Sequence, residues 1–92
     1  MTKAEFTEHL AERASLSRHD AARSVEAMLE ILQDTLRRGG EVRFSGFGRF
    51  HVGERGGRAG VNPRTGERID IEAVRIPRFT AGSALKKAIR DR

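Results

Sequence analysis

The sequence predicts an α+β fold: an N-terminal helical hairpin, a three-stranded antiparallel sheet with an extended β-ribbon arm, and a short C-terminal helix. Apolar residues recur at helical spacing over residues 1–40, alternate with polar ones over 41–81, and return to helical spacing over 82–92. The 92 residues allow one domain, 1–92, with the arm at about 53–74.

The first helix is expected from about Lys3 to Ala14. Thr2 and Glu5 have the spacing of a capping box, in which each side chain satisfies a free backbone N–H of the first turn. Phe6 and Leu10 continue a four-residue repeat toward Ala14, so one face of this helix is expected to be buried.

A second helix follows in the opposite direction. Ser17 is placed to cap it, and Asp20 in the first turn favours the helix dipole. The helix is expected to stop at Gly39-Gly40. Its apolar positions are Ala21, Val25, Met28, Leu29, Leu32 and Leu36.

Two short strands are predicted after the glycines. Val42 and Phe44 alternate with Glu41 and Arg43 before a turn at 45–48, and Phe50 and Val52 alternate with Arg49, His51 and Gly53 after it. Ile76 and Phe79 are expected to close the sheet, and a final helix runs from about Gly82 to Arg90.

Residues 53–68 differ in kind, because they hold five glycines and four arginines but one large apolar residue, Val61. Such a stretch cannot pack into a core, so it is a disordered loop or a projecting arm. Asn62-Pro63-Arg64-Thr65-Gly66 is a turn signal, and Ile69 and Ile71 alternate with acidic residues beyond it. A two-stranded ribbon with its tip at Asn62-Pro63 is therefore predicted.

The composition limits the classes of protein. Only 37% of residues are hydrophobic, so one chain has little material for a core and a partner subunit is expected to supplement it. Cysteine is absent, which disfavours a small secreted domain and indicates the cytoplasm. No apolar run reaches the length of a signal peptide or a membrane span, so no membrane is expected as a partner.

Charge is unevenly distributed along the chain. Residues 1–45 hold seven basic and eight acidic side chains, whereas 46–92 hold eleven basic and five acidic ones. Fifteen of the eighteen basic residues are arginines, whose planar guanidinium suits phosphates. The pattern indicates a polyanion-binding surface, with a merely solubilising face as the alternative.

Residues for catalysis are not found. Ser17, His19 and Asp20 lie too close together at one helix start to form a triad, and His9, His19 and His51 lack the spacing of metal ligands. No phosphate-loop or dinucleotide motif occurs. We therefore expect no enzyme, no metal and no cofactor.

An arginine-bearing ribbon that ends in proline fits a DNA groove. Arginines favour the narrow minor groove, and an apolar wedge can unstack a base step. From the local sequence alone, Pro63 is more simply an ordinary turn proline.

Two motifs and the residues between them resemble those of the HU/integration host factor family of bacterial histone-like proteins. The motifs are Gly46-Phe47-Gly48-Arg49-Phe50 and Asn62-Pro63-Arg64-Thr65-Gly66, and the residues between them are Arg55, Arg58 and Gly60. The opening TKAEF, LSRHDA and the closing IPRFTAGSALK fall in the same order, so the resemblance covers the whole chain. It implies an intertwined dimer whose paired arms embrace DNA, with 1–40 as the dimerisation part, and it favours Pro63 as an intercalating wedge.

The resemblance also implies residue roles. The arm and tip contacts to DNA would be Arg55, Arg58, Asn62, Pro63, Arg64, Thr65 and Arg68. The contacts of the saddle between the arms would be Lys3, Gly46, Arg75, Arg78 and Lys86. The dimer core would hold Leu29, Leu32, Leu36, Phe44, Phe47, Phe50 and Phe79.

Two positions depart from the family pattern. Val61 stands where the family usually has arginine, and Ser83 where a basic residue is common among HU proteins. We therefore expect weaker binding or an altered site preference.

The function predicted is a nucleoid-associated architectural protein of the bacterial cytoplasm. It would bind duplex DNA through the minor groove with little sequence specificity, bend or compact it, and act as a homodimer, with a heterodimer with a paralogue as the other arrangement. The alternatives are a sequence-specific integration-host-factor-like subunit, a small basic RNA-binding protein and a purely structural interaction module.

Overall fold

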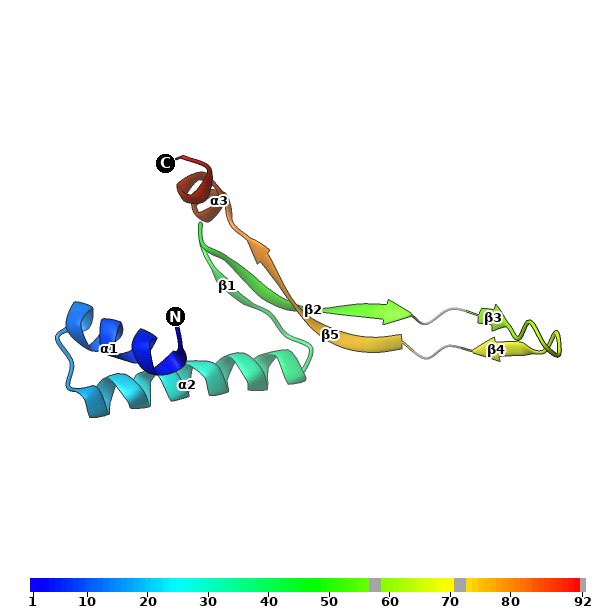
Figure 1. Cartoon of the computed structure of the whole chain (residues 1–92), viewed down its shortest axis with the longest axis horizontal. Helices are drawn as coiled ribbons and strands as arrows, with labels where there is room; N and C mark the ends of the chain where they lie inside the picture. The colour runs from blue at the N-terminus through cyan, green and yellow to red at the C-terminus, as the bar shows by residue number, and fades with distance from the viewer. Residues whose placement is uncertain (57–58, 71–72, 92) are drawn as a thin grey trace. The chain divides into compact units, whose positions relative to one another are not determined.

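The computed structural model describes residues 1–56, 59–70 and 73–91 (Figure 1). They form helices and strands in the order α1, α2, β1, β2, β3, β4, β5, α3. The chain divides into two compact units, Met1–Asp34 and Thr35–Arg92, and each is described by itself. None of the helices in the described ranges is both long and apolar enough to cross a membrane.

Helix α1 (Lys3–Ala14) has the predicted bounds and the Thr2 half of the predicted capping box, while Glu5 bonds to the Thr2 hydroxyl where a bond to a backbone N–H was expected. The backbone N–H of Glu5 donates to Thr2 Oγ1 at 3.2 Å. The Thr2 hydroxyl in turn donates to the Glu5 carboxylate at 3.3 Å, so the two side chains bond to each other. The helix ends at Ser15, which adopts a left-handed conformation with φ 54°.

Helix α2 (Arg18–Arg37) begins as predicted, because the N–H of Asp20 donates to Ser17 Oγ at 3.0 Å. Within the first unit, the buried apolar side chains of the described residues are Ala21 and Val25 alone. Met28, Leu29 and Ile31 of the same helix are exposed. The apolar face of α2 therefore extends well beyond what its own unit covers.

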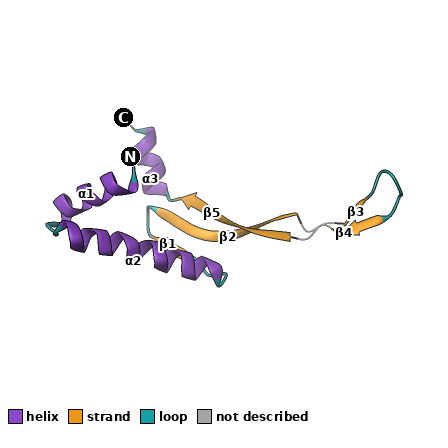
Figure 2. Cartoon of the chain, turned by 60° about the horizontal axis from the view of Figure 1, so that its bottom comes forward, coloured by secondary structure: helices purple, strands orange, loops and turns teal. Residues whose placement is uncertain are grey.

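The second unit contains a three-stranded antiparallel sheet in the order β1, β2, β5 (Figure 2). The strands are β1 (Val42–Phe44), β2 (Gly48–Gly56) and β5 (Ala73–Ala81). In the register, Phe44 pairs with Gly48 and Phe50 with Phe79. The predicted sheet is confirmed, and β2 continues to Gly56, where a loop or arm was expected to have begun.

Strands β3 (Ala59–Val61) and β4 (Arg68–Asp70) pair antiparallel and flank the tip turn. The predicted ribbon with its tip near Asn62-Pro63 is thereby confirmed. The prediction that the returning strand includes Ile71 falls outside the described residues.

Helix α3 (Ser83–Arg90) begins directly against the β1–β2 turn. The Gly82 N–H donates to the Phe47 carbonyl at 2.7 Å, and the Leu85 N–H donates to the Gly46 carbonyl at 3.1 Å. A Cβ at residue 82 would overlap the Gly46 carbonyl, which explains why glycine occupies this position.

Four phenylalanines form a ring cluster in the second unit. The centroid of Phe50 lies 4.8 Å from that of Phe79 and 6.4 Å from that of Phe44, and Phe47 lies 5.8 Å from Phe79. Despite these contacts, Phe44, Phe47 and Phe79 remain 45%, 50% and 43% exposed. One side of this cluster therefore has no cover within the chain's described residues.

Candidate nucleic-acid interface

The described arm presents its arginines to solvent. Arg55 lies in the outer part of β2, Arg64 in the tip turn and Arg68 at the start of β4, and all three are exposed. Arg58, predicted to act with them, lies outside the described residues. One cation thus lies at the outer end of β2 and two lie on the β3–β4 hairpin, and exposed guanidinium groups of this kind suit phosphates.

Hydrogen bonds within the tip turn fix its shape. Asn62 Oδ1 accepts from the Arg64 N–H at 2.9 Å, and the Asn62 carbonyl accepts from the Gly66 N–H at 2.8 Å. The Asn62 N–H donates to the Glu67 carbonyl at 2.8 Å. Gly66 has φ 72°, a left-handed conformation that favours glycine. The exposed Pro63 is therefore held at the end of a well-defined turn.

These bonds give Asn62 and Thr65 a local role. Asn62 uses its side-chain oxygen on the turn, and Thr65 Oγ1 accepts from the Glu67 N–H at 3.3 Å. Both residues were predicted as DNA contacts, which stays a prediction. In addition, the hydrogen bonds of Asn62 and Thr65 fix the shape of the turn that carries Pro63.

Val61 lies next to the tip and is 67% exposed, in register with Arg68 across the ribbon. It is one of the two positions, with Ser83, at which the sequence is expected to depart from the family pattern. Because Val61 is apolar, Arg68 is the one positively charged residue of this cross-strand pair.

The predicted saddle residues have differing surroundings. Lys3 forms an ion pair with Glu26 inside the first unit. In the second unit, Arg75 Nη2 donates to the carbonyls of Leu36 and Arg37 at 3.1 and 3.0 Å. Arg75 therefore satisfies carbonyls at the C-terminal end of α2, a role that the sequence reasoning did not assign to it.

The remaining saddle candidates also belong to the second unit. The side chain of Arg78 lies over Gly53, so a Cβ at residue 53 would collide with it. Gly46 has φ 80° in the β1–β2 turn, and Lys86 is exposed on α3. The structure thus brings Gly46 close to the start of α3, while Lys3 belongs to the other unit.

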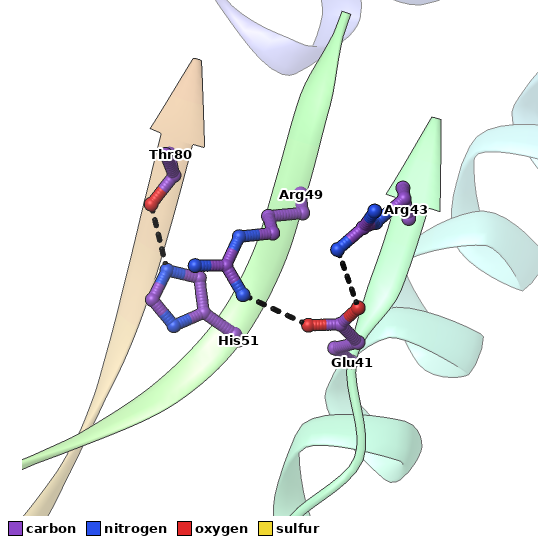
Figure 3. Close-up of polar contacts among 5 residues, drawn as sticks. All are labelled: Glu41, Arg43, Arg49, His51 and Thr80. Carbon is purple, nitrogen blue, oxygen red and sulfur yellow. Dashed lines mark hydrogen bonds and ion pairs between the residues drawn. The ribbon is translucent and has the colours of Figure 1, made fainter. Parts of the chain in front are cut away.

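Sequence reasoning missed a charged group on the sheet. Arg43 Nη2 and Arg49 Nη1 donate to the two oxygens of the Glu41 carboxylate at 3.2 and 3.0 Å (Figure 3). The hydrogen bond from Arg49 is the main cause that lowers the pKa of Glu41 below its usual 4.5, the charge of Arg43 adds to it, and desolvation opposes it. The period-two alternation of the strands could have placed Arg43 and Arg49 on one face.

His51 and Thr80 lie next to this group on neighbouring strands. His51 Nε2 and Thr80 Oγ1 share a hydrogen bond of 2.8 Å across β2 and β5 (Figure 3). Within the described ranges, no three His, Asp or Glu side chains are placed to hold a metal ion.

The predicted dimer-core residues are partly exposed in the single chain. Leu29 is exposed like three of the phenylalanines, and Leu32, Leu36 and Phe50 are half-buried. Each therefore has apolar surface left that a second chain could cover.

Comparison with known proteins gives a consistent result. The sequence profile of a family described as bacterial DNA-binding protein matches residues 1–90. A DNA-binding protein of Rhizobium leguminosarum is 44% identical over 89 residues, covering 97% of this chain and 98% of the relative. DNA-binding protein HU of Staphylococcus aureus is 43% identical over 90 residues, covering 98% and 100%.

Among solved structures, the chain is similar to Anabaena HU in a cocrystal with DNA. The TM-score is 0.80 at 35% sequence identity, and the match covers 100% of both chains.

Proposed function

The chain belongs to the family of bacterial DNA-binding proteins that includes HU, and from this premise we propose that it binds duplex DNA through the minor groove with little sequence specificity and bends or compacts it. The family consists of structural DNA-binding proteins, so the chain is not an enzyme. We place it at the nucleoid in the bacterial cytoplasm.

The arm is the observation that carries the proposal. Arg55 is exposed at the outer end of β2, and Arg64 and Arg68 are exposed on the β3–β4 hairpin, whose turn around Pro63 has a fixed shape. An antiparallel ribbon with guanidinium groups fits a narrow groove of strongly negative potential, where each contact releases counterions. The affinity is therefore mainly electrostatic.

Pro63 acts as the wedge. It lies exposed at the end of a turn that four backbone N–H donors hold in shape. A rigid apolar tip can enter between base steps and unstack them, and the bent duplex then meets more of the protein surface. Because bending cost depends on the sequence being bent, the preference among sites comes from DNA deformability.

The chain acts as a homodimer in this proposal. Phe47, at 50% exposure, and the exposed Met28, Leu29 and Ile31 of α2 leave apolar surface that one chain does not cover. A second copy would supply that cover, since small domains with thin cores are commonly completed by a partner subunit. The dimer would carry two arms, so each duplex would be held from two sides.

A competition experiment with a bending measurement tests the proposal. Labelled linear duplex is competed with mixed-sequence, nicked and RNA duplexes, and the mass of the free protein is measured at the same concentration. We expect a dimer mass, effective competition by any mixed-sequence duplex, stronger competition by nicked duplex and weak competition by RNA. Strong preference for one sequence would indicate an integration-host-factor-like subunit instead, and preference for RNA would reject DNA as the partner.

The wedge is tested separately by fluorescence transfer between the ends of a bound duplex. Pro63→Ala should reduce the bend more than the affinity, because it removes the wedge and leaves the arginines in place. Equal end-to-end distances for the two proteins would contradict the wedge.

A further inference from the structure

The sheet of the second unit has two chemically different faces. On one face, the rings of Phe44, Phe50 and Phe79 pack together. Because side chains alternate along a strand, Arg43 and Arg49 project from the other face. His51 and Thr80 share that polar face (Figure 3).

Glu41 connects two of the arginines on the polar face, on which Arg78, paired in register with His51, also lies. Its Oε1 accepts from Arg43 Nη2 at 3.2 Å and its Oε2 accepts from Arg49 Nη1 at 3.0 Å, so each carboxylate oxygen takes one guanidinium (Figure 3). The arrangement imitates the way in which two arginines grip the oxygens of a phosphate. The lowered pKa of Glu41 means that this carboxylate is ionised at neutral pH.

A surface depression of about 310 Å³ lies beside the pair. Arg43 and Arg49 line it together with the hydroxyl-bearing Ser45 and Thr80, and glycines form much of the rest. A guanidinium has five N–H donors, of which the carboxylate uses those of one nitrogen on each arginine. The depression thus offers space and hydrogen-bonding groups to a small anionic group.

We propose that Arg43 and Arg49 form a further phosphate-binding site on the sheet, outside the arm, which Glu41 occupies when DNA is absent and a phosphodiester of the duplex takes over when DNA binds. The inference rests on the proposed function, because the phosphodiester belongs to the bound duplex. No covalent step is involved, since one anion replaces another at the same two cations.

The exchange is feasible because the ion pairs are exposed. The side chains of Glu41 and Arg43 are 41% and 63% exposed, and exposed pairs gain little from their mutual attraction. Glu41 then sets the affinity of the site, because its negative charge offsets that of the two arginines until a phosphodiester takes its place.

Three variants test the site, measured by fluorescence anisotropy with a mixed-sequence duplex over a series of salt concentrations. Glu41→Gln removes the competing charge and should tighten binding by about 3- to 10-fold at low salt. Glu54→Gln is the matched control, because it removes the same charge from strand β2 without touching the pair. The double variant Arg43→Ala with Arg49→Ala should weaken binding and flatten the salt dependence by about two contacts per chain.

The combination of these changes provides the sharpest test. In the background that lacks both arginines, Glu41→Gln should change the affinity no more than Glu54→Gln does. An equal gain with and without the arginines would overturn the proposal, as would a Glu41→Gln gain no larger than the Glu54→Gln gain. Circular dichroism melts check that all variants fold.

The outcome separates this proposal from the function on which it rests. If the unaltered protein fails to bind duplex DNA, the proposed function is wrong. If it binds and Glu41→Gln behaves as Glu54→Gln, the phosphate site on the sheet alone is rejected.

Discussion

Replacing Arg75 by alanine should destabilise the fold through the end of helix α2. Arg75 Nη2 donates to the carbonyls of Leu36 and Arg37 in the last turn of the helix at 3.1 and 3.0 Å, and the Leu36 carbonyl also accepts from the Gly39 N–H at 2.9 Å. Two hydrogen bonds of roughly 0.5–1.5 kcal/mol each set an upper limit of about 3 kcal/mol. Because Arg75 is exposed and water replaces part of both bonds, we expect a loss of about 1 kcal/mol per chain.

The assay is thermal unfolding followed by circular dichroism at one fixed protein concentration. A loss of about 1 kcal/mol in a chain of this length lowers Tm by roughly 4–8 °C. Arg64→Ala is the control, because it removes the same charge from the exposed tip and should leave Tm within about 2 °C, as surface substitutions usually do. If the Tm of Arg75→Ala equals that of Arg64→Ala, the hydrogen bonds from Arg75 to the end of α2 contribute nothing to stability and the reasoning is refuted.

Three further changes have expected outcomes. Gly82→Ala places a Cβ against the Gly46 carbonyl and breaks the hydrogen bonds that hold α3 to the β1–β2 turn. The free energy of unfolding should fall by at least about 2 kcal/mol, and an unchanged urea midpoint would contradict this. Phe47→Ser should lower the mass measured by light scattering at micromolar concentration toward that of a single chain, and an undiminished dimer would remove Phe47 from the interface. The stability difference between the unaltered protein and Glu41→Gln should be constant above about pH 5 and shrink as the pH falls through the lowered pKa of Glu41, because a carboxyl whose pKa folding lowers stabilises only while it is ionised. A difference that does not shrink as the pH falls would contradict the ion pairs.

Local signals made most of the fold predictable from the sequence. The bounds of α1 follow from the Thr2 cap and the four-residue repeat, and both signals lie within the helix itself. The tip turn follows from Asn62-Pro63 and Gly66, whose conformational preferences act over a few residues. Each of these features needs no distant partner.

Features that depend on distant partners were not predicted. The register of the strands is one of them: a ribbon was predicted over 53–74, but not that Gly56 at the end of β2 pairs with Ala73. Arg75 caps a helix that ends 38 residues before it. Composition and spacing carry no information on such pairings until the register of the strands is known.

The candidate site shows the same division. The exposed arginines of the arm could be identified from the sequence, since a segment whose one large apolar residue is Val61 cannot form a core and must lie at the surface. The hydrogen bond from Arg49 to Glu41 could not be predicted from the sequence, because the two residues are eight positions apart and approach each other only through the β1–β2 turn. The ion pair of Lys3 with Glu26 likewise needed the two helices to be placed.

The most direct test of the account is the salt dependence of duplex affinity, compared between the unaltered protein and a variant with Arg55, Arg64 and Arg68 replaced by alanine. A dimer would carry these arginines twice, and each contacted phosphate contributes about −0.9 to the slope of log Kobs against log salt. The account predicts a steep slope for the unaltered protein, shallower by about 5 in the variant if all six contact phosphates. An affinity that is flat between low and physiological salt, or a variant with the same slope, would contradict it.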